Sequence, residues 1–519
     1  MVTGAELAGI ALAVAAGSSL SGGLIRTSTA HHETIRSRPV VARRSGTSRV
    51  ATGRPAARWR RSSPARGARN GRRAGARWAD VADLAHLVTA GGLPGRLTLG
   101  YTSRGRWGRR IATEPAHSLA VIGPTQSGKT TCLAVPAILE WKGPVLAASV
   151  KTDLVRDTLQ WRSGRGRVWC FDPTGATGLT RSHWSPLASA ATWPGARRAA
   201  ADLTELTRTD GASADAEFWY ATAAKLLAPL LFAAAVAGAT MHDVIRWVET
   251  QETDEVAAIL YGSGVPEALQ AARATWLRDE RQRSSVYTTA ETVLEPFAEP
   301  FAGASPSEDI DPAALLAGHH TLYVCAPAHD QRRLRTVFVA LVQAVVHAAF
   351  ARVGRLGAPL DPPLLVVLDE AANIAPLRDL DGLAATCAGH GVQLVTVWQD
   401  LAQVRARYGD RAATVVNNHR AKLFLPGIAD PATLDFACQL AGDAEVDAPS
   451  VTVGASGERS VTSSPSVRRL LPGDALRRLP RHEAVLLYGS LPPARLCLRP
   501  WYEDRALVRR NASGAAVPA

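Results

Sequence analysis

The sequence predicts an α/β fold in which a sheet of mainly parallel strands is flanked by helices and carries an inserted all-helical domain. Three observations support this prediction. Apolar runs of roughly four to eight residues alternate with helical patterns from about residue 97 onward, which is typical of a parallel sheet covered on both faces. One of these runs leads into a glycine-rich loop that is followed by a helical pattern. Residues of about 196–300 are helical in pattern and contain almost no strand signal.

The composition is that of a globular protein. The chain has 519 residues, of which 46% are apolar and 20% are charged, and this length is sufficient for two or three domains with buried cores. Its six cysteines are scattered without the spacing of a metal site. This distribution is typical of buried thiols in a reducing compartment.

The positive charge is concentrated near the N-terminus. Between Thr34 and Ala79 there is no acidic residue, but there are 14 arginines. Without these 14 arginines the formal net charge of +13 would become −1. We therefore expect residues 31–78 to form a disordered basic linker. Its charge would allow contact with lipid headgroups or nucleic acid, and the alternative is a solvated tether without specificity.

A membrane anchor is a candidate interpretation of residues 1–30. Residues 7–25 are uncharged, and a stretch of that length can span a bilayer, although its glycines and serines make it only marginally hydrophobic. If it spans, the rest of the chain is expected on the cytoplasmic side of the cytoplasmic membrane. The alternatives are a non-spanning amphiphilic segment, a signal peptide, or a wholly cytoplasmic protein.

The remaining chain divides around the helical insertion. We expect the first part of a nucleotide-binding domain at 79–195, the helical domain at 196–300, the second part at 301–505 and a disordered tail at 506–519. The long apolar stretch 218–237 contains Lys225 and Pro229, so we interpret it as a buried core helix and not as a second membrane span. The predicted strands are HSLAVIG (117–123), GPVLAASV (143–150), GRVWCFDP (166–173), HTLYVCAP (320–327), PPLLVVLDE (362–370), GVQLVTVWQ (391–399) and AKLFLPGI (421–428), and residues 332–353 are expected to be helical.

The glycine-rich loop VIGPTQSGKTT (121–131) has the pattern G-x-x-x-x-G-K-[ST], between a predicted strand and a predicted helix. This pattern is typical of P-loop NTPases, in which backbone N–H groups surround a polyphosphate. We expect Lys129 to reach the β- and γ-phosphates and the Thr130 hydroxyl to ligate Mg²⁺, so the predicted cofactors are ATP and Mg²⁺. The expected nucleotide-binding residues are Gly123, Pro124, Thr125, Gln126, Ser127, Gly128, Lys129, Thr130 and Thr131.

Two further strand ends are predicted to complete the site. In LLVVLDE, Asp369 is expected to bind Mg²⁺ and Glu370 to polarise the attacking water as a general base. Gln399 follows another predicted strand and is a candidate contact for the γ-phosphate. The alternative for Gln399 is an ordinary amide at the end of a strand.

Several motifs, taken in order, resemble the conjugative coupling proteins of the TraG/TraD type, which belong to type IV secretion systems. They are GPTQSGKTT, SVKTD, VWCFDPTG with HWSPL, EFWYATAAKLL, VVLDEAANI, GVQLVTVWQDLAQVRARYGD, VVNNHRAKLFLPG and LLYGSLPPARLCLRPWYED, and together they span about 95–505. The resemblance implies a fold like that of RecA-like hexameric motors. It also implies a membrane-anchored ATPase that recruits a relaxase–DNA complex, or another secreted protein, and pumps single-stranded DNA towards the components of a secretion channel.

The sequence departs from this family in two places. Members commonly have two N-terminal membrane helices, whereas this chain has one weak candidate. Many members also carry an arginine about eleven residues before the strand-end Gln, where this chain has Ala388. We expect Arg420, together with Lys422, to act instead on the nucleotide of a neighbouring subunit, and the alternative is that Arg420 pairs with a surface acid. The alternative functions are an FtsK-like pump for double-stranded DNA and a nucleotide-dependent docking adaptor without motor activity.

Overall fold

A computed structural model describes residues 75–91, 94–104, 108–207, 214–298, 310–325, 331–453 and 457–512. The predicted anchor segment and nearly all of the basic segment lie outside these residues. Residues 75–78 fall within the range predicted to be linker, but they contact the folded body. The backbone N–H of Ala76 donates to the carbonyl of Asp443, and Trp78 packs against the hydrophobic core.

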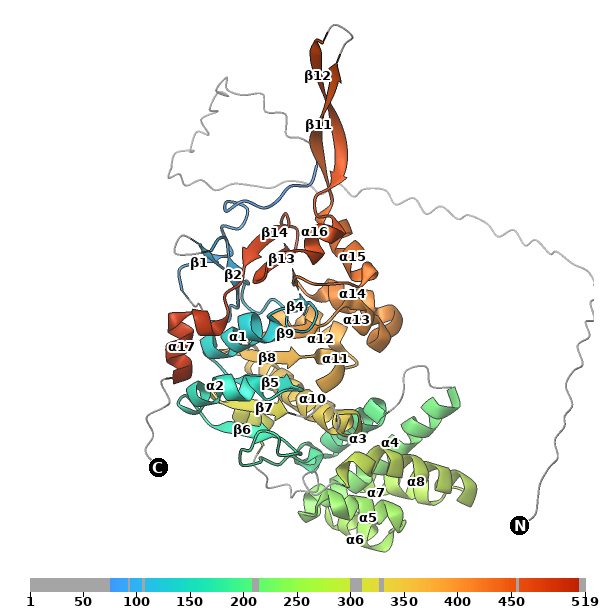
Figure 1. Cartoon of the computed structure of the whole chain (residues 1–519). Coiled ribbons are helices and arrows are strands. Elements are labelled where there is room, and N and C mark those ends of the chain that lie inside the picture. Colours follow the sequence, from blue (N-terminus) through green and yellow to red (C-terminus); the bar gives the residue numbers. More distant parts are fainter. Residues whose placement is uncertain are drawn as a thin grey trace, which may run out of the picture. The chain divides into compact units, whose positions relative to one another are not determined.

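The described residues contain a twelve-stranded sheet, in the order β1-β3-β2-β14-β13-β10-β4-β9-β8-β5-β7-β6 (Figure 1). The strands from β10 to β6 in this order are all parallel to their neighbours. Each of them lies within one of the predicted strands. They are β4 (Leu119–Ile122), β5 (Val145–Ser149), β6 (Val168–Phe171), β7 (Thr321–Cys325), β8 (Leu364–Asp369), β9 (Val392–Trp398) and β10 (Ala421–Phe424).

An antiparallel extension, which the sequence patterns did not predict, continues the sheet beyond β10. It consists of β13 (Glu483–Tyr488), β14 (Ala494–Cys497), β2 (Thr98–Tyr101), β3 (Arg110–Ala112) and β1 (Val88–Thr89). A separate two-stranded hairpin, also not predicted, is formed by β11 (Asp443–Val453) and β12 (Arg459–Arg469). These strands are short or polar, so they lack the apolar runs that identify the central strands.

Two hydrophobic cores explain why the central strands are apolar throughout. In β8, Leu364, Val366 and Leu368 belong to one core, whereas Leu365 and Val367 belong to the other. Successive side chains point to opposite faces of a strand, so helices must cover both faces of the sheet. Helices α1 (Val135–Glu140) and α2 (Asp153–Ser163) contribute to the second core, and α10 (Gln331–Leu356) contributes to the first.

The helical insertion lies between β6 and β7, which are neighbours in the sheet. The described part of residues 193–298 is helical, with no strand among the residues described. Its helices are α3 (Trp193–Thr207), α4 (Ala214–Ala237), α5 (Met241–Glu249), α6 (Asp254–Gly262), α7 (Pro266–Trp276) and α8 (Glu280–Leu294). Helix α3 of the insertion packs against α10, which is one of the helices that cover the sheet.

Helix α4 is the long apolar segment that we interpret as a core helix. By length and composition both Asp215–Ala237 and Arg333–Leu356 could cross a membrane. In α4, however, Leu226, Leu230 and Leu231 are completely buried, and the helix packs against α3, α7 and α8. The interpretation of α4 as a buried core helix is therefore confirmed.

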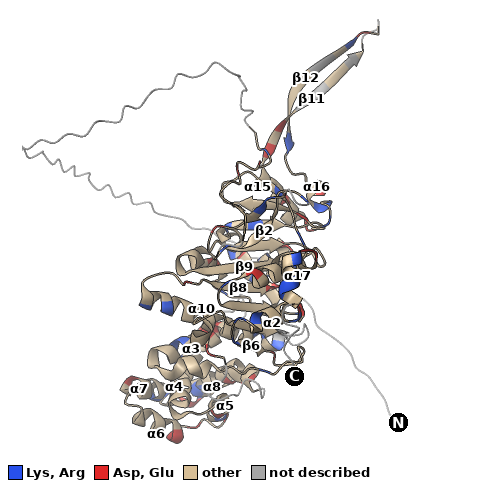
Figure 2. Cartoon of the chain, turned by 90° about the vertical axis from the view of Figure 1, so that its left-hand side faces the viewer, with Lys and Arg blue, Asp and Glu red and all other residues tan. Residues whose placement is uncertain are grey.

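The C-terminal residues differ from the prediction. Residues 506–512 were expected to belong to a disordered tail, but Arg505–Ala512 form helix α17, which packs against α1 and α2. Leu507 is buried in this contact. The sequence pattern did not identify this helix because four of its eight residues are Arg or Asn. Its basic residues can be followed in Figure 2. Elsewhere in the described part of the chain, basic and acidic residues are scattered, and most of the ribbon is neither basic nor acidic (Figure 2).

Candidate nucleotide-binding site

The phosphate loop joins β4 to a short π-helical turn, Thr130–Ala134, which continues into α1. Gly123 has no room for a side chain, because a Cβ there would lie 2.8 Å from both the Leu425 Cβ and the Ser127 Oγ. Gly128 has a φ of +96°, a conformation that residues with a side chain rarely adopt. The two glycines of the motif are thus required for the fold of the loop, as well as for close approach of a phosphate.

The Lys129 side chain is directed into the loop that precedes it. Its Nζ donates hydrogen bonds to the carbonyl oxygens of Gly123 and Pro124, at 2.5 and 2.7 Å. Burial lowers the pKa of Lys129, and the nearby carboxylates of Asp369 and Glu370 oppose this effect. The ammonium group is therefore held at the centre of the loop, where the motif places the β- and γ-phosphates.

Asp369 lies at the end of β8 and accepts two hydroxyl hydrogen bonds. Thr130 Oγ1 and Ser149 Oγ each lie 3.2 Å from its Oδ2. Burial raises the pKa of Asp369, whereas the two hydroxyl groups lower it. The structure therefore brings together the two residues that were predicted to bind the metal, Thr130 and Asp369.

A hydroxyl and a carboxylate oxygen suit Mg²⁺, which usually takes one or two protein ligands and completes its shell with phosphates and water. The described residues contain no group of three or more His, Cys, Asp or Glu side chains that could hold a metal by themselves. The site thus fits a Mg²⁺ ion that arrives with a nucleotide. When bound, such an ion would neutralise charge on the phosphate oxygens.

Glu370 follows Asp369 in a left-handed backbone conformation, with a φ of +61°. This conformation is uncommon for residues other than glycine and occurs frequently at functional sites. It turns the chain from β8 into helix α11 (Ala371–Ile374). Asn373 Nδ2 donates to Glu370 Oε2 at 3.1 Å, and Lys151 Nζ lies 3.9 Å from Glu370 Oε1. Each oxygen of the Glu370 carboxylate thus has one contact, a hydrogen bond from Asn373 and a longer ion pair with Lys151.

Gln399 lies beside the first residue of the phosphate loop. It directly follows β9, whose Trp398 is paired with Ile122 of β4. The backbone N–H of Gly123 donates to the carbonyl of Trp398 at 3.1 Å, and the side chain of Gln399 is partly exposed. This position is compatible with the predicted contact to the γ-phosphate.

The predicted residues other than Arg420 lie at one edge of the sheet. The strands β4, β9, β8 and β5 are consecutive in the sheet, and the phosphate loop, Gln399, Asp369 and Ser149 lie at or next to their carboxyl ends. Ligands of open α/β sheets bind at this edge. The tertiary structure thus assembles residues that are up to about 280 positions apart in the sequence.

Arg420 lies at the opposite edge. It precedes β10, whose first residue Ala421 is paired with Leu119, the first residue of β4. The whole length of β4 therefore separates Arg420 from the loop of its own chain. Arg420 is exposed, and its guanidinium group covers Gly489, where a Cβ would lie 2.5 Å from its central carbon. Within one chain the structure does not bring Arg420 to the nucleotide site.

A family profile described as "Type IV secretory system Conjugative DNA transfer" matches residues 84–519. The chain belongs to this family. Its predicted resemblance to coupling proteins of the TraG/TraD type is confirmed by this match and by the relatives and structures described next.

Two relatives of this member of the conjugative DNA transfer family are the proteins TraG and VirD4. Conjugal transfer protein TraG of Escherichia coli is 25% identical over 405 residues, which cover 70% of this chain and 62% of TraG. Protein VirD4 of Rhizobium radiobacter is 24% identical over 453 residues, which cover 84% of this chain and 64% of VirD4. The aligned part of the chain thus spans less than two thirds of the length of these relatives.

Solved structures of the coupling protein TrwB have the same fold. TrwB in complex with the ATP analogue ADPNP has a TM-score of 0.61 and 19% identity, and the match covers 82% of this chain and 94% of that one. TrwB in complex with ADP and Mg²⁺ has a TM-score of 0.55, also at 19% identity. The predicted fold class, a RecA-like α/β sheet flanked by helices with an inserted helical domain, is therefore confirmed.

Three residues of this family member contact the predicted site but were not assigned to it from the sequence. Ser149 binds Asp369, whereas Lys151 and Asn373 contact Glu370. The signal that could have identified Ser149 and Lys151 is SVKTD, which follows an apolar run in the same way that Asp369 and Glu370 follow LLVVL. The sequence pattern did not indicate that the Asn373 side chain would contact Glu370.

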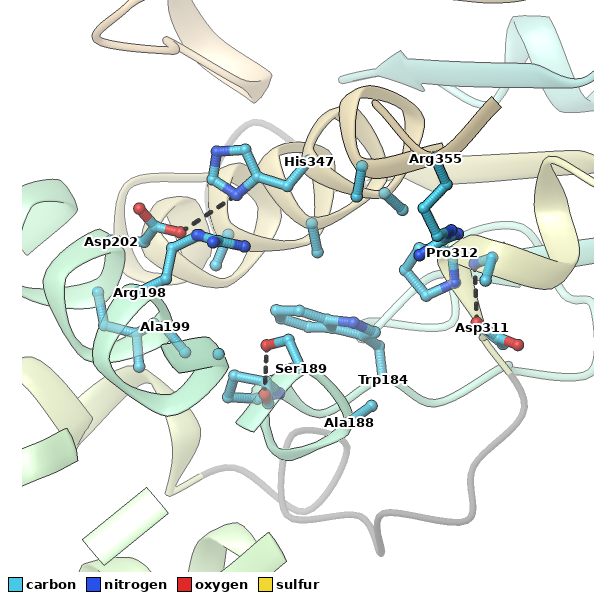
Figure 3. Close-up of a pocket in the computed structure, with 18 residues that line it drawn as sticks. Trp184, Ala188, Ser189, Arg198, Ala199, Asp202, Asp311, Pro312, His347 and Arg355 are labelled. Atoms are coloured by element: carbon cyan, nitrogen blue, oxygen red, sulfur yellow. Dashed lines mark hydrogen bonds and ion pairs between the residues drawn. The ribbon is translucent and has the colours of Figure 1, made fainter. Parts of the chain in front are cut away.

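A separate cavity of about 360 Å³ lies between α3, α10, the 3₁₀ turn Pro186–Ala191 and α9 (Pro312–Leu315) (Figure 3). The Asp202 carboxylate and His347 Nδ1 lie 3.5 Å apart on its wall. Burial, followed by the charge of Glu205, raises the pKa of Asp202 to about 6, and burial lowers the pKa of His347. The lining also includes Ser189, Arg198, Asp311 and Arg355, and most of the remaining lining residues are small and apolar.

Proposed function

We propose that the chain is an Mg²⁺-dependent ATPase that moves DNA during conjugation. It recruits a relaxase-bound single strand and drives this strand towards a type IV secretion channel. The oligomer that performs this work is a ring, expected to be a hexamer, attached to the cytoplasmic membrane through the N-terminus.

One observation carries the proposal: the edge of the sheet combines the parts needed to bind and to hydrolyse a nucleotide. Lys129 provides the positive charge within the phosphate loop, Thr130 and Asp369 form a hydrogen-bonded pair that suits Mg²⁺, and Glu370 lies next to them. A protein that only binds nucleotide does not need a carboxylate to activate water. The combination therefore favours hydrolysis over binding alone.

Membership of the family, together with the nucleotide complexes of TrwB, supports the assignment to conjugation. The geometry of the site supports ATP hydrolysis as the reaction. Membership of the family supports DNA as the transported molecule. The relaxase, other secreted proteins and the channel components are partners proposed on the same family grounds.

The test is ATP turnover of the full chain with Mg²⁺, measured alone, with single-stranded DNA and with double-stranded DNA. We expect hydrolysis that single-stranded DNA stimulates. Lys129→Ala should reduce the turnover number by roughly 10²-fold or more, because the phosphates lose a preorganised charged donor. Lys142→Ala is the matched control, since Lys142 is an exposed lysine beyond α1 and should retain full turnover.

The other outcomes identify the alternatives. Stimulation by double-stranded DNA alone would favour an FtsK-like pump. Tight ATP binding without turnover under every condition would favour a docking adaptor, and the ATPase proposal would then be wrong.

A further inference from the structure

Strands β5 and β8 place two short motifs side by side. The strands are parallel and adjacent, and their register sets Ser149 opposite Asp369. Lys151 lies two residues beyond the end of β5, and Glu370 directly follows β8. The segment 149–151 is therefore positioned against the two acidic residues of the nucleotide site, and the proposed function gives no task to Lys151.

Lys151 and Asn373 contact different oxygens of the Glu370 carboxylate. Lys151 Nζ lies 3.9 Å from Oε1, and Asn373 Nδ2 lies 3.1 Å from Oε2. The Lys151 side chain is 55% exposed, whereas the Glu370 side chain is only 16% exposed. The lysine thus approaches the carboxylate from its solvent side, while Asn373, from the helix that follows Glu370, holds the second oxygen.

The two contacts restrict the rotation of the carboxylate, and a general base requires such restriction. It must keep its oxygen within hydrogen-bond reach of the water that it activates, and small losses of alignment reduce rates strongly. Glu370 has three side-chain torsions, and its backbone is already fixed in a left-handed conformation. Contacts at the end of the side chain are therefore the remaining means of orienting it.

We propose that Lys151 is a positioning residue for Glu370, holding the carboxylate in the orientation in which it activates water. This inference rests on the proposed ATPase function. Because Lys151 acts through Glu370, its removal should slow the chemical step without weakening nucleotide binding. Because the pair is long and partly exposed, the effect should be modest, about threefold to tenfold.

The first test is a double-mutant cycle on the full chain. Lys151→Ala should lower kcat by about threefold to tenfold and leave KM for ATP within about twofold. Lys151→Arg, which restores a cation of similar reach, should recover most of the loss. In a Glu370→Gln background, measured by single-turnover hydrolysis of labelled ATP, Lys151→Ala should cause no further decrease.

Three results of the cycle would overturn the inference. An unchanged kcat would show that the contact has no role. A raised KM with unchanged kcat would show that Lys151 binds the nucleotide directly. An equal loss in the presence and absence of the Glu370 carboxylate would show that Lys151 acts independently of it.

The second test does not depend on turnover. The chain has only five lysines, at 129, 142, 151, 225 and 422, so acetylation of each can be followed separately by mass spectrometry. Glu370→Gln should increase the acetylation rate of Lys151 by roughly twofold, because a neutral amide no longer holds the ammonium group. The rate at the exposed Lys142 should not change.

The two tests separate this inference from the proposed function. A wild-type chain that never hydrolyses ATP contradicts the proposed function, and the acetylation experiment still decides whether Lys151 and Glu370 are paired. An unchanged acetylation rate at Lys151 overturns the pairing even if the chain is an active ATPase.

Discussion

Asp369 and Glu370 are adjacent in the sequence but have different surroundings. Asp369 ends β8, is 3% exposed and accepts hydrogen bonds from two hydroxyl groups. Glu370 lies beyond the strand in a left-handed conformation and is contacted by a lysine and an asparagine. These different surroundings are compatible with the proposed division of roles, in which Asp369 binds the metal and Glu370 activates water.

This difference predicts the behaviour of Glu370→Gln. The amide has nearly the shape of the carboxylate but cannot accept a proton from water, so turnover should fall by roughly 10²-fold or more. Lys129, Thr130 and Asp369 are unchanged, so ATP should still bind with Mg²⁺. Single-turnover hydrolysis and equilibrium binding of labelled ATP would measure the two effects separately.

An Asp369→Asn variant provides the comparison for Glu370→Gln, since it alters the predicted metal ligand and should weaken Mg²⁺-dependent binding. If Glu370→Gln hydrolyses ATP at the wild-type rate, Glu370 is not the general base.

Helix α17 lies in the range that was expected to be a disordered tail. Its Leu507 is buried against the helices that cover the sheet. Arg510 donates to the carbonyl of Leu139 in α1, and Asn511 donates to the carbonyl of Asp157 in α2. Helix α1 continues the π-helical turn that follows the phosphate loop, so α17 contacts an element connected to the loop.

Removal of α17 should therefore destabilise the fold. A chain that ends after residue 504 lacks the buried leucine and these hydrogen bonds, which should lower the free energy of unfolding by about 2–3 kcal/mol. For a folded body of this size, that change corresponds to a decrease in Tm of about 2–3 °C. Thermal unfolding followed by circular dichroism would measure the decrease.

The control truncation ends after residue 512 and retains α17. It should unfold at the same temperature as the full chain. Equal unfolding temperatures for the two truncations would show that α17 does not contribute to stability.

At the scale of the whole molecule, the basic N-terminal segment is separate from the nucleotide site in sequence. Contacts of residues 76–79 with the folded body indicate where a deletion of this segment should end. Ala76 and Ala79 are hydrogen-bonded to the backbone of Asp443 and Pro493, and Trp78 lies 4.6 Å beneath the Arg495 guanidinium group. A deletion should thus end at residue 74 and not at residue 79.

Deletion of residues 1–74 removes 13 of the 14 arginines and retains every residue of the site. We expect a folded, soluble ATPase with weaker non-specific binding to DNA or to anionic lipid. The slope of log K for single-stranded DNA against log salt should become shallower by about 0.7 for each phosphate that the arginines no longer neutralise. An unchanged slope, measured by fluorescence titration over a range of salt concentrations, would mean that these arginines do not bind phosphates.

A ring would also explain the position of Arg420. Because this residue lies at the opposite edge of the sheet from its own phosphate loop, it can assist hydrolysis only at the site of a neighbouring subunit. Lys422 is less suitable, because its Nζ donates to the carbonyls of His419 and Asn417, and burial lowers its pKa to about 8. We retain Arg420 as the predicted residue that acts in trans.

This prediction can be tested by mixing two inactive variants. Arg420→Ala should reduce turnover by roughly 10³-fold or more, as expected for an arginine that stabilises the transferred phosphate. Lys129→Ala is also expected to be inactive. In mixed rings, however, some sites combine an intact Lys129 with an intact Arg420 from the neighbour, so turnover should return.

Arg411→Ala is the matched control. Arg411 forms an ion pair with Asp381 of its own chain, so its removal should leave turnover nearly unchanged. Mixed rings that form but stay inactive, or full activity of Arg420→Ala alone, would exclude a role in trans.

The central sheet and most residues of the candidate nucleotide site could be predicted from the sequence. Buried parallel strands must be apolar on both faces, so the segments containing LAVI and LLVVLD were recognisable as apolar runs. The phosphate loop was recognisable because binding a polyphosphate through the backbone requires glycines and a lysine at fixed spacing. Both signals are local, so they can be read without knowledge of the fold.

Features that depend on contacts between distant segments could not be predicted from the sequence. The antiparallel strands β1, β2 and β3 are too short to show a pattern, and α17 is a short helix that packs against α1 and α2. The register of β5 and β8 brings Lys151 to Glu370, and the pairing of β10 with β4 separates Arg420 from its own loop. Strand order and register determine which side chains meet, and neither can be deduced from a local sequence pattern.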